Sequence, residues 1–320
     1  MVWNCYLSVF RAKSPVHIGY RQIGILKTTR YYITGRAMWG AITANLTRAL
    51  FENPSPEDYR TVGNFVRKNI RTTYFYPAIK KTDIENPEEW SEIEVKDYFV
   101  FLPNYINGLR FGKILKEEFE QIFIGSFVST ALESTTKTAE EGSLHEFEFI
   151  KDKVKIGESV ANVYWVGYLF IKEDELEGIK IESCNGGDVA ISIGTTKRYL
   201  RNIIDQLYVG GERNYGLGRL KLLELTKETG SIFGRYSIEL NDENPILKNL
   251  DEESVAISHV KLDGLELELG EIEPVVGLEW SAKGAGQEVS KAEICATPGS
   301  KLKSCNFILC DYGILKSKNS

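Results

Sequence analysis

The spacing of hydrophobic residues predicts one strand and two helices at the start of the chain. Residues 2–11 are rich in aromatic and β-branched side chains, which favour a strand. From Thr34-Gly35 onward, apolar side chains recur at three- and four-residue steps, as in an amphipathic helix: Met38, Ala41, Ile42, Leu46, Ala49 and Leu50. Ser55-Pro56-Glu57-Asp58 combines a capping serine, a first-position proline and first-turn acids, so a second helix is expected there.

The middle of the chain mixes strand and helix patterns. Strands are predicted at residues 72–77, 96–102, 144–150, 163–171 and 219–225, and helices at 112–124 and 196–208. The pattern at 196–208 is the clearest helix of the sequence, with apolar side chains at helical steps between Thr195 and Gly210-Gly211. Its apolar positions are Leu200, Ile203, Ile204, Leu207 and Tyr208.

This order of elements predicts an α+β fold with antiparallel pairing, because strands and helices mix without a regular βαβ repeat. Helices on one face of such a sheet would give a ferredoxin-like, or RRM-like, core. Residues 1–228 are expected to form this core. Residues 229–320 carry many acids, several glycines and short alternating runs such as residues 265–269, so a smaller β-rich part is expected there.

Composition describes an ordinary globular chain of 320 residues, 42% hydrophobic and 26% charged, long enough to bury a large core. No apolar run is long enough to span a membrane, and the N-terminus has no basic region, so neither a transmembrane span nor a signal peptide is predicted. The five cysteines are an odd number without a C-x-x-C pair, which favours a reducing cytoplasm over a disulfide framework.

Charge is unevenly distributed along the chain. The formal net charge is −6, yet residues 1–50 contain seven Lys and Arg and not one Asp or Glu. A second basic island lies at 197–221, whereas residues 239–273 hold eleven acids and only two lysines. A bipolar chain of this kind can bind a polyanion in one groove and repel it elsewhere. Solvated charged faces would explain the same pattern.

The segment at residues 210–219, Gly-Gly-Glu-Arg-Asn-Tyr-Gly-Leu-Gly-Arg, is the most informative motif. Its glycines permit positive φ and close approach to a ligand, and successive amides in such a turn can bind an anion. Arg213 and Arg219 have the donor geometry that suits phosphate, and Tyr215 offers a ring for base stacking. The segment is neither a P-loop nor a dinucleotide fingerprint. Lys197, Arg198 and Arg201 in the first turns of the predicted helix would favour a bound polyanion. A solvated helix end and a flexible hairpin are the alternative.

Several short motifs resemble those of the RAMP proteins, the repeat-associated mysterious proteins of CRISPR–Cas systems. The loop at 210–219 resembles their glycine-rich loop. Residues 32–41, Tyr-Ile-Thr-Gly-Arg-Ala-Met-Trp-Gly-Ala, are similar to the segment that opens their first helix, with Thr34 and Arg36 in place of the usual proline and serine. Residues 131–150 are similar to a Thr-x-x-Ala-x-x-Gly-x-Leu stretch, and Pro298-Gly299-Ser300 and Tyr312-Gly313 to the second part of the family.

The resemblance implies an RRM-like core that holds CRISPR guide RNA in a type III-like effector complex, with other effector subunits and target RNA as further partners and with a role in antiviral defence. It leaves open whether the chain holds the 5′ handle, forms part of the backbone or processes repeat RNA. The expected RNA contacts are Lys27, Arg30, Tyr31, Arg36, Trp39, Lys197, Arg198, Gly210, Gly211, Arg213, Tyr215, Gly216, Gly218 and Arg219.

Catalysis is the weaker expectation. Family members that cut target RNA carry an aspartate before the first helix, but residues 24–30 here contain no carboxylate that could hold a divalent cation. No metal and no cofactor are therefore expected. Metal-free RNA processing needs a general acid–base pair, for which His17 is the best candidate. Cys295, Cys305 and Cys310 fit no common zinc spacing. The run Tyr74-Phe75-Tyr76 could stack bases or belong to a core strand. A third hypothesis is a protein scaffold that docks a neighbour through the acidic stretch at 239–273.

Overall fold

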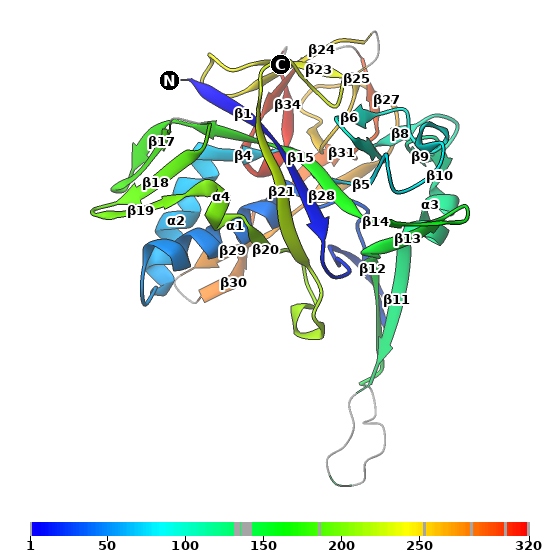
Figure 1. Cartoon of the computed structure of the whole chain (residues 1–320), viewed down its shortest axis with the longest axis horizontal. Helices are drawn as coiled ribbons and strands as arrows, with labels where there is room; N and C mark the ends of the chain where they lie inside the picture. Colours follow the sequence, from blue (N-terminus) through cyan, green and yellow to red (C-terminus); the bar gives the residue numbers. More distant parts are fainter. Residues whose placement is uncertain are drawn as a thin grey trace.

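The computed structural model describes residues 2–130, 135, 143–184, 187–251, 254–281, 284–303 and 306–318. Its central feature is a largely antiparallel sheet in the order β20-β21-β1-β15-β5-β7-β6, with β4 also paired to β15 (Figure 1). The strands of this sheet are β20 (Gln206–Tyr208), β21 (Arg219–Glu228), β1 (Trp3–Ala12), β15 (Tyr164–Lys172), β4 (Ile70–Thr72), β5 (Tyr76–Lys80), β7 (Tyr98–Val100) and β6 (Glu94–Val95).

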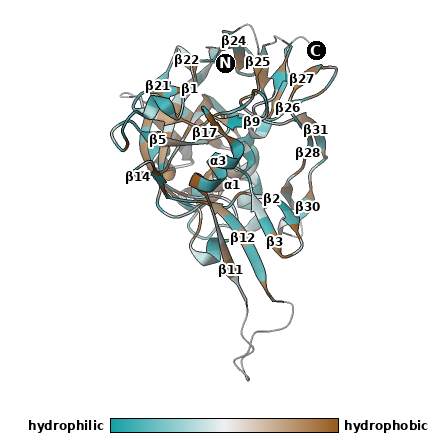
Figure 2. Ribbon diagram, turned by 90° about the vertical axis from the view of Figure 1, so that its right-hand side faces the viewer, coloured by the Kyte–Doolittle hydropathy of each residue, from teal (hydrophilic) through white to brown (hydrophobic). Residues whose placement is uncertain are grey.

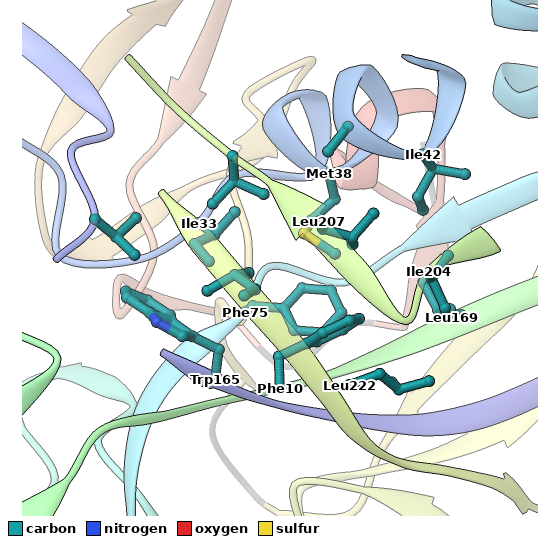
Figure 3. Packing of buried hydrophobic residues seen from close by; sticks show 14 of the residues in the cluster. Phe10, Ile33, Met38, Ile42, Phe75, Trp165, Leu169, Ile204, Leu207 and Leu222 are labelled. Atoms are coloured by element: carbon teal, nitrogen blue, oxygen red, sulfur yellow. The ribbon is translucent and has the colours of Figure 1, made fainter. Parts of the chain in front are cut away.

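Both faces of this sheet are buried. Phe10 of β1 and Trp165 of β15 point to one face, where they meet Phe75, Met38 and Leu207 (Figure 3). Helix α1 (Gly35–Leu50) covers this face, with α2 (Pro56–Asn69) packed against α1. Because successive strand residues point to opposite sides, the alternate residues of β1, such as Leu7 and Val9, belong to a second cluster on the other face.

The C-terminal residues supply twelve of the 28 buried residues of that second cluster. In the described part of residues 229–318 the regular elements are strands and one short 3₁₀ turn, η3 (Asp311–Gly313). The larger sheet here is β22 (Ser231–Ile232), β23 (Tyr236–Glu239), β24 (Ile246–Asn249), β33 (Phe307–Leu309), β34 (Leu315–Ser317), β26 (Val260–Lys261), β31 (Glu293–Ala296) and β28 (Ile272–Val275). β25 (Ser254–Val255), β32 (Lys301–Leu302) and β27 (Leu267–Leu269) form a smaller sheet, and β29 (Leu278–Ser281) pairs with β30 (Gly284–Val289). The fold is thus α+β with mostly antiparallel sheets, as predicted, and the boundary at residue 228 stays a prediction.

Smaller sheets surround the central one. A sheet in the order β11-β12-β3-β2 combines β11 (Ile124–Ser129), β12 (His145–Ile150), β3 (Leu26–Thr29) and β2 (Gly19–Ile23), and it projects from the body of the molecule (Figure 2). One further sheet contains β8 (Pro103–Tyr105), β9 (Leu109–Phe111) and β10 (Ile114–Leu115). A two-stranded sheet contains β13 (Lys153–Ile156) and β14 (Ser159–Asn162). A four-stranded sheet contains β16 (Asp174–Leu176), β17 (Ile179–Ser183), β18 (Val189–Ile193) and β19 (Thr196–Tyr199).

The predicted N-terminal elements are present where the local signals put them. Thr34 caps α1 by accepting the Ala37 amide at 3.3 Å, and Ser55 and Asp58 form a capping box at the start of α2. Gly35 is required by a tertiary contact, because a Cβ there would lie 2.2 Å from the Tyr312 carbonyl oxygen. Two of the segments that resemble the RAMP proteins, 32–41 and Tyr312-Gly313, therefore touch in the fold.

The predicted helix at 196–208 is wrong. Residues 196–199 form β19, which pairs with β18 across the two-residue turn Gly194-Thr195, and residues 206–208 form β20, which pairs with β21. Only α4 (Leu200–Ile203) remains helical. The four apolar side chains at 200, 203, 204 and 207 are buried as their periodicity implied, but strand partners on both sides override the weak helical preference of the segment. The helix predicted at 112–124 is shorter, α3 (Lys116–Phe123).

Candidate nucleic-acid interface

The glycine loop at 210–218 rests against residues 15–17 of the N-terminal loop. Gly210 has φ +74°, and a Cβ there would lie 2.0 Å from the His17 carbonyl oxygen. Gly218 has φ +85°, and its Cβ would lie 2.1 Å from the carbonyl oxygen of Val209. These two glycines are therefore needed for contact with the protein's own backbone.

The amides of the loop are also used inside the protein. The Gly211 N–H donates to His17 at 2.9 Å, the Gly218 N–H to Pro15 at 2.8 Å, and the Gly216 N–H to Arg213 at 2.9 Å. These three amides already have carbonyl partners and are not free to bind an anion, while the anion-binding concavity expected of the loop as a whole stays a prediction. The loop also exposes several side chains to solvent.

Those side chains are exposed and basic. Among the described residues, the Arg213 guanidinium donates to the Gly210 carbonyl at 3.1 Å, and the Arg219 guanidinium to the Gln206 side chain at 3.3 Å. Lys13 is exposed beside Arg219, since its backbone N–H donates to the Arg219 carbonyl at 2.8 Å. Within the described ranges none of these three cations is within ion-pair distance of a carboxylate. They form an uncompensated cationic surface, called here the loop cations.

An aromatic cluster includes Tyr215, which lies on the same loop as Arg213. Tyr215 and Phe127 are 45% and 48% exposed, with ring centroids 6.0 Å apart, over the buried ring of Phe147. The Tyr215 hydroxyl lies 3.1 Å from Nε2 of His145. The rings come from the glycine loop and from strands β11 and β12, which project from the body of the molecule (Figure 2). Tyr215 was predicted from sequence, but Phe127 and His145 were missed because nothing local links a strand at 124–129 to a loop near 215.

The cations predicted in the first 50 residues are all paired. Lys27 binds Glu212 at 2.7 Å, Arg30 binds Glu273 at 2.6 Å, and Arg36 binds Glu279 at 3.3 Å. Their charges are therefore balanced by acids from distant parts of the chain. Acidic and basic residues that are far apart in the sequence are therefore neighbours in the fold for Lys27, Arg30 and Arg36.

The side chains of Tyr31 and Trp39 each donate a hydrogen bond to a distant part of the chain. The Tyr31 hydroxyl donates to Glu120. The Trp39 indole N–H donates to the Gly63 carbonyl at 2.8 Å and so joins α1 to α2. Both side chains are half-buried. The run Tyr74-Phe75-Tyr76 is fully buried in the two clusters, which rules out base stacking there.

Lys197 and Arg198 lie on β19, in a different sheet from the glycine loop. Lys197 is 3.6 Å from Glu182, and Arg198 is exposed. They do not sit at a helix N-terminus, so the helix-dipole argument for phosphate binding at this point does not apply.

His17 is 4% exposed, and its Nδ1 lies 2.6 Å from the Glu148 carbonyl oxygen. Its ring packs edge-on against Phe147, and its own carbonyl accepts the Gly211 amide. These contacts indicate a structural role for His17 beneath the glycine loop. Because its side chain is buried, an RNA hydroxyl has little access to it.

Arg36 and the glycine loop belong to neighbouring sites. Ile18 lines one pocket together with Arg30 and Arg36, and a Cβ on Gly210 would lie 2.9 Å from Cδ1 of Ile18. Ile18 therefore contacts both the pocket that holds Arg36 and the start of the glycine loop. Residues 213–216 of the loop are exposed to solvent.

Among the residues with described positions, no group of three or more His, Cys, Asp and Glu could hold a metal ion. Cys295 is buried and Cys310 half-buried, while Cys305 lies outside the described residues, as does most of the motif at 131–144. The helices of the described chain are too short or too polar to cross a membrane.

No protein-family model and no curated protein matches the sequence. Solved structures do. A chain of the Type III-B Cmr-beta complex bound to cognate target RNA and AMPPnP superimposes with a TM-score of 0.51 at 11% identity, over 93% of this chain and 86% of that one. The complex bound to cognate target RNA gives 0.47 at 12% identity, with the same coverage. Oligomeric Cmr4 from Pyrococcus furiosus gives 0.27 at 13% identity, over 71% of this chain and 100% of that one. The first of these superpositions shows that this chain has the fold of a chain in the type III-B Cmr-beta complex.

Proposed function

We propose that this protein is a non-catalytic RNA-binding subunit of a type III-like CRISPR effector complex. One observation carries the proposal: the exposed Arg213 and the exposed ring of Tyr215 share the glycine loop, Arg219 and Lys13 lie at its base, and the Tyr215 ring neighbours the exposed ring of Phe127. Unpaired cations for phosphates next to rings for bases are what a single-stranded nucleic acid requires. The matched Cmr-beta complex is itself described with cognate target RNA bound.

A ferredoxin-like core is part of the proposal. Strands β21, β1 and β15 are neighbours, β4 and β5 continue beyond β15, and α1 connects β1 to β4 through α2. A strand–helix–strand–strand–helix–strand core places its strands in the spatial order fourth, first, third, second, and this arrangement follows that order. The second helix is reduced to the single turn of α4.

We further propose that the RNA is the guide and that this subunit holds its 5′ handle. The alternatives are a backbone subunit, and an endoribonuclease that uses His17. The absence of any carboxylate from residues 1–50 argues against metal-dependent cleavage from the loop before α1. The burial of His17 argues against the metal-free route, since a general base must reach the hydroxyl it deprotonates.

Binding of a single-stranded RNA as a function of salt tests the RNA-binding role. The wild-type affinity should fall steeply with salt, and each lost phosphate contact should reduce the log–log slope by about 0.7. Arg213→Gln and Arg219→Gln should each weaken binding and flatten the slope. Lys68→Gln, at an exposed lysine near the end of α2, is the control and should change neither. A flat wild-type slope, or equal effects of all three variants, would contradict the proposal.

Sequencing of co-purified RNA tests the finer assignment. RNA recovered with the complex should share one defined 5′ end, and a crosslink to Tyr215 should map near that end. Crosslinks spread evenly along the guide would favour a backbone subunit instead.

A further inference from the structure

A pocket with mainly aromatic walls lies at the end of β3, where residues from three parts of the chain meet. The link from β3 to α1 supplies Arg30, Tyr31 and Tyr32, the β8–β9 sheet supplies another side, and the C-terminal strands supply the third. The rings that line the pocket are Tyr20, Tyr31, Tyr32, Tyr105 and Phe111. Such a wall suits a flat, unsaturated ring better than a flexible chain.

Arg30 forms part of this wall as a fixed flat surface. Its guanidinium carbon lies 4.5 Å from the ring centroid of Tyr20 and 5.9 Å from that of Tyr32. The ion pair with Glu273 and a 3.0 Å hydrogen bond to the Tyr32 hydroxyl hold it in place. Because its charge is already neutralised, Arg30 is suited to stacking on a base and not to binding a phosphate.

The opposite wall is also rigid. The Tyr31 ring packs against Phe111 at 5.4 Å and Phe119 at 5.6 Å, and its hydroxyl is held by Glu120. Tyr105 is 8% exposed, with its hydroxyl 3.5 Å from Oγ1 of Thr297. Side chains fixed in this way lose little conformational freedom when a ligand binds.

One edge of the pocket is acidic. Glu271 lines it, is exposed, and has no ion-pair partner in the part of the chain that the structure describes. A carboxylate accepts hydrogen bonds and therefore favours a ring with an exocyclic amine. Adenine, cytosine and guanine carry such an amine, whereas uracil presents carbonyl oxygens in its place.

The pocket lies close to the proposed RNA path. Lys27 of β3 contacts Glu212 of the glycine loop, and Arg30 is three residues further along the chain, about 10 Å away at the usual rise of a strand. A strand of RNA on the loop cations can therefore reach the pocket along β3.

We infer that this pocket receives one nucleobase, turned out of a single-stranded RNA, and that it selects a base with an exocyclic amine. The inference rests on the proposed RNA-binding function and adds a specificity site to it. The base lies between the wall of Tyr31 and Phe111 and the wall formed by Tyr20 and Arg30, with its amine directed to Glu271. The remainder of the strand follows the loop cations.

The test is a set of short RNAs in which one abasic nucleotide is moved along the sequence. For the wild-type protein, one position should cost about tenfold in affinity and its neighbours much less. In Tyr20→Ala this position should lose its effect, whereas Tyr20→Phe should keep it. Tyr20 is exposed on β2, so its truncation leaves the core intact.

A second arm tests the base preference with exposed residues only. At the sensitive position, cytosine should bind roughly fivefold better than uracil to the wild type. Glu271→Gln should remove this preference, and Glu268→Gln, an exposed glutamate of the same segment outside the pocket, should retain it. Affinity that is indifferent to every abasic position, with Arg213→Gln still weakening binding, would overturn the pocket but not the RNA-binding function. Indifference to Arg213→Gln as well would overturn both.

Discussion

Arg30 and Glu273 form a buried ion pair, with Nη1 and Oε1 2.6 Å apart and a sequence separation of 243 residues. The guanidinium comes from the basic N-terminal region, and the carboxylate from the acidic segment at 239–273. The two charge blocks that suggested a groove for a polyanion and a face that repels it therefore meet in the interior at this point. Glu273 also contacts Nε2 of buried His259, whose Nδ1 lies 2.7 Å from the Tyr74 hydroxyl.

Removing one partner of this pair should destabilise the protein strongly. Glu273→Gln leaves the Arg30 charge buried without a counter-charge and should lower the free energy of unfolding by about 3 kcal/mol. Arg30→Met combined with Glu273→Gln should recover part of this loss, because the glutamine can still accept from His259. Urea unfolding of the two single variants and the double variant measures the coupling. Strictly additive losses would mean that the pair makes no direct contribution.

Acidification should reduce stability in two stages. Burial lowers the pKa of His259, so below about pH 6.5 the unfolded chain binds a proton that the folded protein does not. Burial by itself would raise the pKa of Glu273, but the hydrogen bond from His259 and the charge of Arg30 lower it to about 2. A second loss is therefore expected below about pH 4.3, where the unfolded carboxyl becomes protonated.

Chemical unfolding between pH 8 and pH 3 measures this profile. His259→Gln should remove the first stage and Glu273→Gln the second. If both variants keep the wild-type dependence on pH, other groups are responsible.

The glycines of the loop should differ in their tolerance of substitution. Gly210→Ala places a Cβ 2.0 Å from the His17 carbonyl oxygen at φ +74°, so a loss above about 3 kcal/mol is expected. Gly216 has φ +85°, but a Cβ there would meet no described atom within 4 Å, so Gly216→Ala should cost only about 1 kcal/mol. Thermal and urea unfolding distinguish the two. Equal losses would show that the contact with His17 is dispensable.

The aromatic cluster should contribute to RNA affinity through stacking. Tyr215→Ala and Phe127→Ala should each weaken binding of a single-stranded RNA about tenfold without changing the salt slope, because no charge is lost. Tyr215→Phe should bind nearly as well as the wild type. Fluorescence anisotropy at several salt concentrations gives both quantities. A changed slope with unchanged affinity would contradict a stacking role.

The purified protein should not cleave repeat RNA in EDTA, and no 2′,3′-cyclic phosphate product is expected. His17→Ala should lower stability instead, since Nδ1 of His17 lies 2.6 Å from a backbone carbonyl oxygen and its ring packs on Phe147. Cleavage by the wild type that is lost in a folded His17→Ala variant would restore the endoribonuclease alternative.

The sequence alone determined the elements whose signals are local. The strand at 2–11, the helices that begin at Thr34 and Ser55, and the strands near 144–150, 163–171 and 219–225 follow from side-chain alternation, helical periodicity and capping residues. The exposed Arg213 and Tyr215 could also be identified, because a glycine-rich loop lies on the surface and its long side chains remain in solvent.

Tertiary structure decided everything that depends on a partner far away in the chain. Residues 196–208 have helical spacing, yet pairing with β18 and β21 makes most of them strand. Lys27, Arg30 and Arg36 form a basic block in the sequence, but Glu212, Glu273 and Glu279 neutralise them in the fold. Local spacing sets which faces can be buried. Long-range strand pairing and charge compensation then select the conformation of each segment and the cations that stay unpaired among the described residues.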